Sequence, residues 1–273
     1  MDAARRYIEV LAFVVLWMAL GWIFHLDANS YLLIGVPLVG LFQRFVRPQP
    51  LRCLWVRDAT AFRLGLVGSV IAVLLMLAPG YDLVLIAILK KLWVVALWLL
   101  CAIAGAVVAA FAITQQRASA ACRGLPSFIA AGLIGMTIIA AGALARHHPS
   151  GVPLSRLFPL LKQFLLYFAV TFILEEVAFR GALDSHIYQP RTNGQHRDSP
   201  WLSAIFVSAL WGIWHLPIAG IHSASASTLA IPVLIMVHTS VGVPLSFCWR
   251  ASGTLVLPAA APALVDSYRN ALL

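Results

Sequence analysis

The stretch FILEEVAFRG, residues 172–181, places two adjacent glutamates and an arginine inside a run that is otherwise as apolar as a membrane span. Each charged side chain of this kind costs about 2.5 to 3.5 kcal/mol at the centre of a membrane helix. Ionisable residues in a span usually face the protein interior or a water-filled cavity. The stretch therefore raises the question of what Glu175, Glu176 and Arg180 do together.

The composition around this stretch is that of a membrane protein. Hydrophobic residues make up 62% of the 273 residues and charged residues only 11%, whereas soluble domains carry about 25% charged residues. The net charge of +9 is typical of nucleic-acid binding as well, but the basic residues lie between apolar runs. We therefore expect a lipid bilayer as the partner and no nucleic acid. The four cysteines show neither a disulfide framework nor a metal-ligand spacing.

Long apolar runs predict an all-α, polytopic transmembrane bundle of about eight or nine helices. The runs cover residues 7–26, 30–45, 62–79, 84–114, 125–145, 157–188, 201–221, 228–249 and 254–272. The runs 84–114 and 157–188 exceed the about 20 residues that one straight span needs, so we expect each to extend beyond the membrane or to begin at its surface. Lys90 and Lys91 fit such a lead-in at the headgroups.

The arginines predict the orientation of the bundle. If each run crosses once, twelve of them fall on one side: Arg5, Arg6, Arg44, Arg47, Arg52, Arg57, Arg63, Arg117, Arg123, Arg191, Arg197 and Arg250. Positive loops face the cytoplasm, so we expect the N-terminus inside and the C-terminus outside. The expected location is a bacterial inner (plasma) membrane.

Four predicted helices carry an ionisable residue near the same depth: Glu175, His215, His238 and Asp266. Their common depth suggests one shared polar site. Glu176 and Arg180 are four residues apart, so they share a helix face and can pair. A purely structural interpretation stays open. In it, Glu176 and Arg180 form an ion pair that holds helices together, and the histidines make interhelical hydrogen bonds.

At EEVAFR followed by WGIWH, the sequence resembles the CPBP family, the CAAX-processing and bacteriocin-processing-related membrane proteases also called the ABI family. The family pattern has EExxxR, then FxxxH, then HxxxN or HxxxD on successive helices. The first motif is complete at Glu175, Glu176 and Arg180. The second matches at His215, with Trp211 where phenylalanine is usual.

The third motif departs from the family pattern. The segment SGTLVLPAAAPALVD places Pro262 at the histidine position and Asp266 at the asparagine or aspartate position. His238, one helix earlier, is the candidate replacement imidazole. The resemblance covers residues 125–273, so we expect a protease core there and an N-terminal transmembrane extension of unassigned role over residues 1–124.

The resemblance implies an intramembrane endopeptidase of the glutamic type, without a bound metal or other cofactor. Glu175 would activate water, and Glu176 and Arg180 would orient Glu175. His215, with His238, would hold the water or stabilise the oxyanion. An ionised Asp266 would repel an oxyanion, so it would be protonated or would orient another donor. The implied substrate is a membrane-anchored protein, lipidated or tail-anchored. The expected substrate-pocket residues are Phe179, Trp211 and Trp214.

Three alternatives remain at this point. A family member without the third-motif histidine could act as a scaffold or immunity-type membrane protein. A zinc-dependent membrane protease could use Glu175, His215, His238 and Asp266 as ligands. A transporter could use the buried charges to carry protons.

Overall fold

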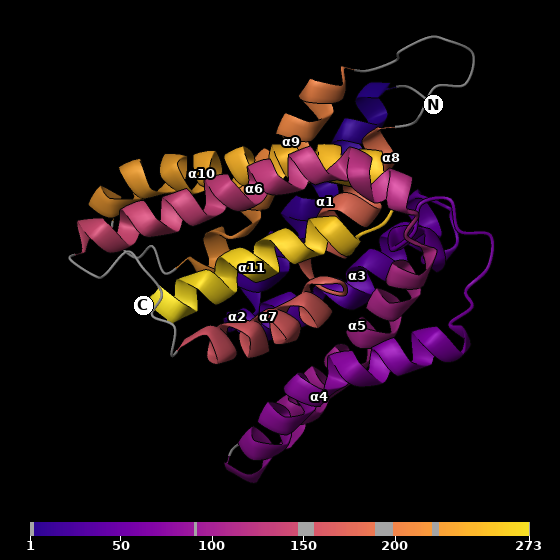
Figure 1. Cartoon of the computed structure of the whole chain (residues 1–273). Helices are drawn as coiled ribbons and strands as arrows, with labels where there is room; N and C mark the ends of the chain where they lie inside the picture. The colour runs from indigo at the N-terminus through magenta and orange to yellow at the C-terminus, as the bar shows by residue number, and fades with distance from the viewer. Residues whose placement is uncertain (1–2, 90–91, 147–155, 189–198, 220–223, 273) are drawn as a thin grey trace.

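The computed structural model of the chain describes residues 3–89, 92–146, 156–188, 199–219 and 224–272, and it is a bundle of helices (Figure 1). Within these residues the β-structure is limited to an isolated bridge between Val56 and Thr254. Six of the described helices are long and apolar enough to cross a membrane: 3–23, 28–46, 96–115, 118–145, 200–218 and 228–252. The prediction of an all-α polytopic bundle is confirmed.

The helices follow the predicted apolar runs, with shifted ends. They are α1 (Ala3–Ile23), α2 (Ala28–Leu33), α3 (Gly35–Leu41), the π-helix η1 (Phe42–Val46), the 3₁₀-helix η2 (Leu51–Leu54), α4 (Gly65–Leu89), α5 (Leu92–Gln115), α6 (Ala118–Ala145), α7 (Leu157–Thr171), the π-helix η4 (Val177–Asp184), α8 (Ser185–Ile187), α9 (Pro200–Trp214), the 3₁₀-helix η5 (Leu216–Ile218), α10 (Ala224–Ser252) and α11 (Val256–Leu272).

Two predicted boundaries are wrong. The helix predicted for 62–79 continues as α4 to Leu89, so residues 84–89 belong to α4 and not to the start of the next span. Likewise α6 begins at Ala118 and not at 125. Lys90 and Lys91 lie outside the described residues.

The long run 157–188 is divided in the structure. Helix α7 ends at Thr171, a turn follows over residues 172–174, and the chain then enters η4 from Glu176. A π-helix of eight residues is rare, and π-segments occur frequently at functional sites. The EEVAFR motif therefore lies where the helix changes its winding.

The long helices pack in layers around this segment. Helix α10 packs against α6 and α9, and α11 packs against α6 and α7. Figure 1 shows α6 and α10 lying side by side with α11 beneath them, and the α4 and α5 pair on the far side of α7. This arrangement brings α7, η4, α9, α10 and α11 around one interior.

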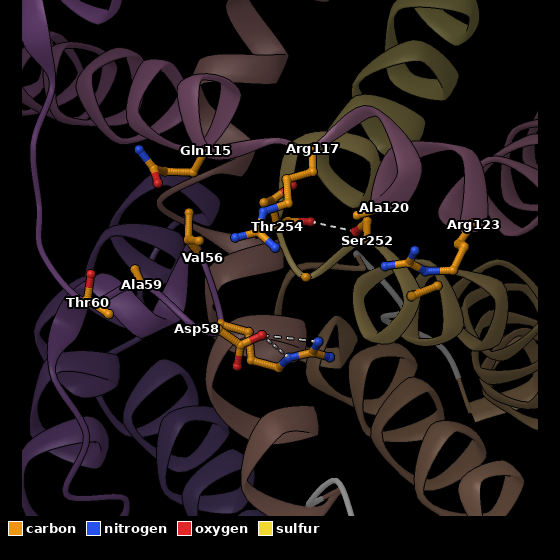
Figure 2. Close-up of a pocket in the computed structure, with 13 residues that line it drawn as sticks. Val56, Asp58, Ala59, Thr60, Gln115, Arg117, Ala120, Arg123, Ser252 and Thr254 are labelled. Atoms are coloured by element: carbon orange, nitrogen blue, oxygen red, sulfur yellow. Dashed lines mark hydrogen bonds and ion pairs between the residues drawn. The ribbon is translucent and has the colours of Figure 1, made fainter.

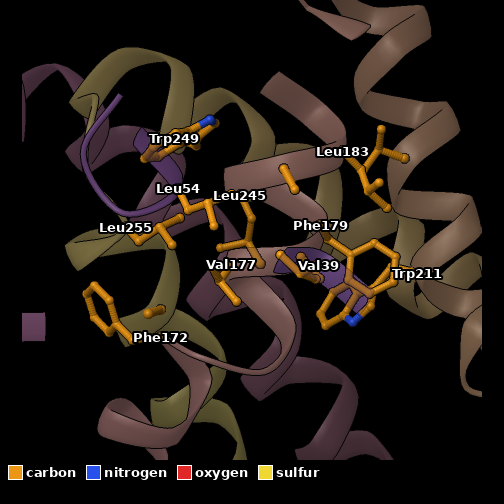
Figure 3. Packing of buried hydrophobic residues seen from close by; sticks show 14 of the residues in the cluster. Val39, Leu54, Phe172, Val177, Phe179, Leu183, Trp211, Leu245, Trp249 and Leu255 are labelled. Atoms are coloured by element: carbon orange, nitrogen blue, oxygen red, sulfur yellow. The ribbon is translucent and has the colours of Figure 1, made fainter. Parts of the chain in front are cut away.

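The N-terminal part of the chain joins the same hydrophobic core. Trp17, Tyr31 and Leu54 belong to the cluster that contains Phe179 and Trp214. Figure 3 shows Leu54 from η2 beside Leu245 and near the η4 side chains Val177 and Phe179. The predicted division after residue 124 stays a prediction, but that boundary falls inside the single helix α6.

Three of the arginines that the sequence placed on one side contact the segment of η4 and α8. Arg6 donates to the Ile187 carbonyl at 3.1 Å, and Arg47 donates to the Gly181 carbonyl at 3.1 Å. Arg250 donates to both carboxylate oxygens of Asp184, at 2.6 and 3.0 Å. These contacts connect α1, the end of η1 and α10 to η4 and α8. Arg191 and Arg197 lie outside the described residues.

Candidate active site

Glu175 and Trp211 bring two distant motifs together. The indole N–H of Trp211 on α9 donates to Oε2 of Glu175 at 3.1 Å. Glu175 is half-buried, while Trp211 is buried. One carboxylate oxygen is thus held by a fixed donor. The aromatic residue of the second motif therefore positions the first glutamate of the first motif.

His215 and His238 lie against each other beside this carboxylate. Their ring centroids are 4.1 Å apart, and the His238 ring is 4.8 Å from the Trp211 ring. Glu175 interacts electrostatically with His238. Three of the four residues predicted at a common depth, Glu175, His215 and His238, therefore converge.

The backbone fixes the tautomer of both histidines. Nδ1 of His215 lies 2.8 Å from the Trp211 carbonyl, and Nδ1 of His238 lies 2.8 Å from the Leu234 carbonyl. A carbonyl oxygen only accepts hydrogen bonds, so Nδ1 carries the proton in each ring. In its neutral form each ring therefore presents Nε2 as an acceptor.

Glu176 and Arg180 form a buried pair behind the half-buried carboxylate. Arg180 Nε lies 3.6 Å from Glu176 Oε2, and neither residue is exposed. Within the described residues, both carboxylate oxygens and all three guanidinium nitrogens lack a hydrogen-bond partner. The guanidinium also lies 5.0 Å from the centre of the Trp211 ring. Buried polar groups of this kind usually bind internal water, which we expect between these atoms.

Small residues from α9 and α10 make room around Arg180. A Cβ atom on Gly242 would lie 2.9 Å from Arg180 Nη2 and 2.7 Å from the Ser208 Oγ atom. The hydroxyls of Ser208 and Ser246 are buried and lack a partner within the described part of the chain. Sequence reasoning missed these three positions, because serine and glycine are common in membrane helices and carry no motif here.

Asp266 occupies a different part of the site. It pairs with Arg269, one turn later on α11, at 2.9 Å. Both residues interact electrostatically with Glu175. Of the two expectations for Asp266, protonation or the orientation of another donor, this contact favours the second. Arg269 was missed by the motif, although its spacing of three residues from Asp266 is visible in the sequence.

Phe179 and Trp214, two of the predicted substrate-pocket residues, are fully buried. Trp214 packs against the rings of Phe179, Trp17 and Tyr31, with centroids 5.4, 5.0 and 5.2 Å away. Tyr31 also donates its hydroxyl to the Trp214 carbonyl at 2.8 Å. These contacts give both side chains a packing role. Trp214 also contacts the His215 ring, with centroids 4.8 Å apart, so both Trp211 and Trp214 touch the polar cluster.

The zinc alternative predicted a ligand set from four helices. Among the described residues, no three histidine, cysteine, aspartate or glutamate side chains are arranged to hold a metal ion. Asp266, one of the four expected ligands, is paired with Arg269.

Comparison with known proteins locates the resemblance in the second half of the chain. Residues 157–268 match the family model described as type II CAAX prenyl endopeptidase Rce1-like. The comparisons with curated proteins and with solved structures give no match. The matched range includes Glu175, Trp211, His215, His238 and Asp266. The resemblance predicted from the motifs is thus confirmed over residues 157–268, which are similar to the Rce1-like family.

Proposed function

We propose that this protein is an intramembrane endopeptidase that hydrolyses a peptide bond in a membrane-anchored protein, with Glu175 as the base that activates water. The observation that carries the proposal is the contact between Trp211 and Glu175, with the paired imidazoles of His215 and His238 beside it. The Rce1-like match supports a protease.

Glu175 and the histidines are suited to hold an attacking water. The Trp211 N–H engages Oε2, so Oε1 is the oxygen that accepts a proton. A water between Oε1 and an imidazole Nε2 would donate one hydrogen to each acceptor, which directs an oxygen lone pair toward the substrate carbonyl. The tautomers therefore favour holding the water over stabilising the oxyanion as the role of the neutral histidines.

In the remaining steps Glu175 carries one proton from the attacking water to the leaving amine. Glu175 takes a proton from water, the hydroxyl oxygen bonds to the carbonyl carbon, and a tetrahedral oxyanion forms. Collapse of this intermediate breaks the C–N bond, and Glu175 returns the proton to the leaving amine. Arg269, oriented by Asp266, supplies positive charge for the oxyanion.

The location of the site supports a proposal for the substrate class. Trp211 and His238 lie on helices long and apolar enough to cross a membrane, and Glu175, just before η4, contacts Trp211. A polypeptide reaches them most directly from within or beside the bilayer. We therefore propose lipidated or tail-anchored proteins as substrates, at the membrane of a bacterial cell with the protein's N-terminus in the cytoplasm.

A substrate panel in heavy-oxygen water tests this function. Purified full-length protein in phosphatidylcholine nanodiscs would be incubated with a lipidated peptide, a tail-anchored peptide and the same sequence without an anchor. We expect cleavage of an anchored peptide, heavy oxygen in the new carboxylate, no covalent adduct on the protein, and the same rate with chelator.

Each other outcome contradicts a part of the proposal. Cleavage that stops in chelator and returns with zinc would contradict the glutamic mechanism. An acyl-enzyme adduct in the intact-mass spectrum would contradict direct attack by water. A panel that stays intact would favour the scaffold alternative.

A further inference from the structure

A second polar site lies at the arginine-rich end of the bundle, away from Glu175. Here the loop after η2 (residues 56–60), the junction between α5 and α6, and the turn between α10 and α11 enclose a pocket of about 310 Å³. Figure 2 shows side chains from all three segments around it. None of the motif residues lines this pocket.

The pocket has a strong positive charge. Arg57, Arg117 and Arg123 line it, and among the described residues Asp58 is the only acidic side chain in its lining. Asp58 is 81% exposed and lies 3.4 Å from Arg57, so its ion pair is screened by solvent. Arg117 and Arg123 have no ion-pair partner among the described residues. Two guanidinium groups are therefore available to an anion.

The two arginines lie near the start of the same helix, and both line the pocket. Arg117 is the N-cap of α6 and Arg123 follows two turns later, on either side of the buried Ala120. In Figure 2 both side chains reach toward the loop that carries Ser252 and Thr254. Arginine presents a planar fork of donors that matches the oxygens of a phosphate.

The first turn of α6 adds to this attraction. The Arg117 side chain makes no cap hydrogen bond, so no side chain at this N-cap satisfies the first N–H groups of a helix of 28 residues. Such an N-terminus carries partial positive charge and binds anions. Ala120, in this turn, lines the pocket.

The opposite wall is held by Arg57. Its Nη1 donates to the Arg250 carbonyl at 2.8 Å, and its backbone N–H donates to the Gly253 carbonyl at 2.9 Å. Gly253 has a φ of +71°, which lets the chain turn sharply from α10 into α11. The wall is thus formed before any ligand arrives.

The pocket lies at a membrane boundary. The spans 96–115 and 118–145 meet at Arg117, and the outer face of α6 beyond the pocket exposes Leu125, Ile129 and Leu133. A lipid whose phosphate occupies the pocket could lay its acyl chains along this face. Arginine-rich loops face the cytoplasmic leaflet, which carries anionic lipids.

From these observations we propose that this pocket binds a phosphate group, carried by the headgroup of an anionic phospholipid or free in solution. The site is independent of the proposed peptidase chemistry, and its ligand would link the α5–α6 junction to the turn between α10 and α11.

Native mass spectrometry of the full-length protein tests the proposal. Wild type and the Arg117→Gln, Arg123→Gln double variant would be released from nanodiscs of phosphatidylcholine with phosphatidylglycerol. We expect the wild type to retain phosphatidylglycerol and the double variant to bind it about twenty-five-fold more weakly, about five-fold for each arginine. Arg146→Gln, at the other end of α6, is the matched control and should retain the lipid.

A second arm separates the two sources of phosphate. Inorganic phosphate would be titrated into protein in pure phosphatidylcholine nanodiscs. Saturable binding that the double variant loses would assign the site to free phosphate. Equal lipid retention by wild type and double variant, without phosphate binding, would overturn the proposal, and so would an equal loss in Arg146→Gln. Matching thermal unfolding of the variants would confirm that they are folded.

Discussion

Trp211 is the residue that most directly links the two motifs. Its N–H donates to Glu175, its backbone carbonyl accepts from His215, and its ring covers Arg180. The sequence predicted Glu175, His215 and His238 as partners from their depth alone. It could not predict the tautomers, because these depend on which backbone carbonyl each ring reaches.

The first residue-scale prediction concerns this indole. Trp211→Phe keeps an aromatic ring but removes the donor to Glu175. A hydrogen bond to a charged group contributes about 1.5 to 3 kcal/mol, so we expect kcat/KM for the anchored peptide to fall about ten-fold or more. Trp201→Phe is the control, since Trp201 lies on the same helix and is exposed. An unchanged rate in Trp211→Phe would contradict the positioning role.

The second residue-scale prediction concerns the space around Arg180. Gly242→Ala would place a methyl group 2.7 Å from Ser208 and 2.9 Å from the guanidinium. Such overpacking costs about 1 to 3 kcal/mol, so the midpoint of thermal unfolding should fall. Gly142→Ala, on α6, meets no atom within 4 Å and should instead gain about 0.5 to 1 kcal/mol. Equal midpoints in the two variants would contradict this packing.

At the scale of elements, hydropathy predicted where helices lie but not how they are divided. The run 157–188 was correctly seen as too long for one span. The sequence did not predict its turn at residues 172–174 or the π-helix η4. Both replace ordinary backbone hydrogen bonds, and no glycine or proline marks the break in the sequence. The i, i+4 pairing of Glu176 and Arg180 survives this change of winding.

The element-scale prediction tests how η4 is anchored. Asp184, at the end of η4, is fully buried and holds Arg250 of α10 through two hydrogen bonds. Removing one partner of a buried ion pair costs about 3 to 5 kcal/mol. We expect Asp184→Asn to lower the free energy of unfolding by that amount. Asp58→Asn removes an exposed pair and should change it by at most about 1 kcal/mol. Similar losses in both variants would contradict the anchoring role.

At the scale of the whole molecule, composition predicted the bundle, and the orientation that the arginine pattern indicates stays a prediction. The tight packing of residues 1–124 on the site was not predictable. It rests on contacts between distant side chains, such as Trp55 donating to the Phe172 carbonyl at 3.1 Å. Such contacts have no local sequence pattern, so the N-terminal part was expected as an extension of unassigned role.

The whole-molecule prediction tests the orientation. Cys122 is exposed near the start of α6, whereas Cys53 and Cys248 are buried and Cys101 is half-buried. A membrane-impermeant maleimide should label Cys122 from the cytoplasmic side only. In a Cys122→Ser background, Arg146→Cys should be labelled from the opposite side. Labelling of both positions from one side would contradict the topology.

The account rests most heavily on Glu175 as the base in a shared polar site. The direct test compares cleavage of the anchored peptide by wild type, Glu175→Gln and Glu9→Gln in nanodiscs. Glu9 is a matched carboxylate on α1, paired with Arg5 and His186 at 2.8 Å. We predict that Glu175→Gln lowers kcat by about 10² to 10⁴ while Glu9→Gln keeps the wild-type rate. A Glu175→Gln protein that cleaves as fast as wild type would contradict the account.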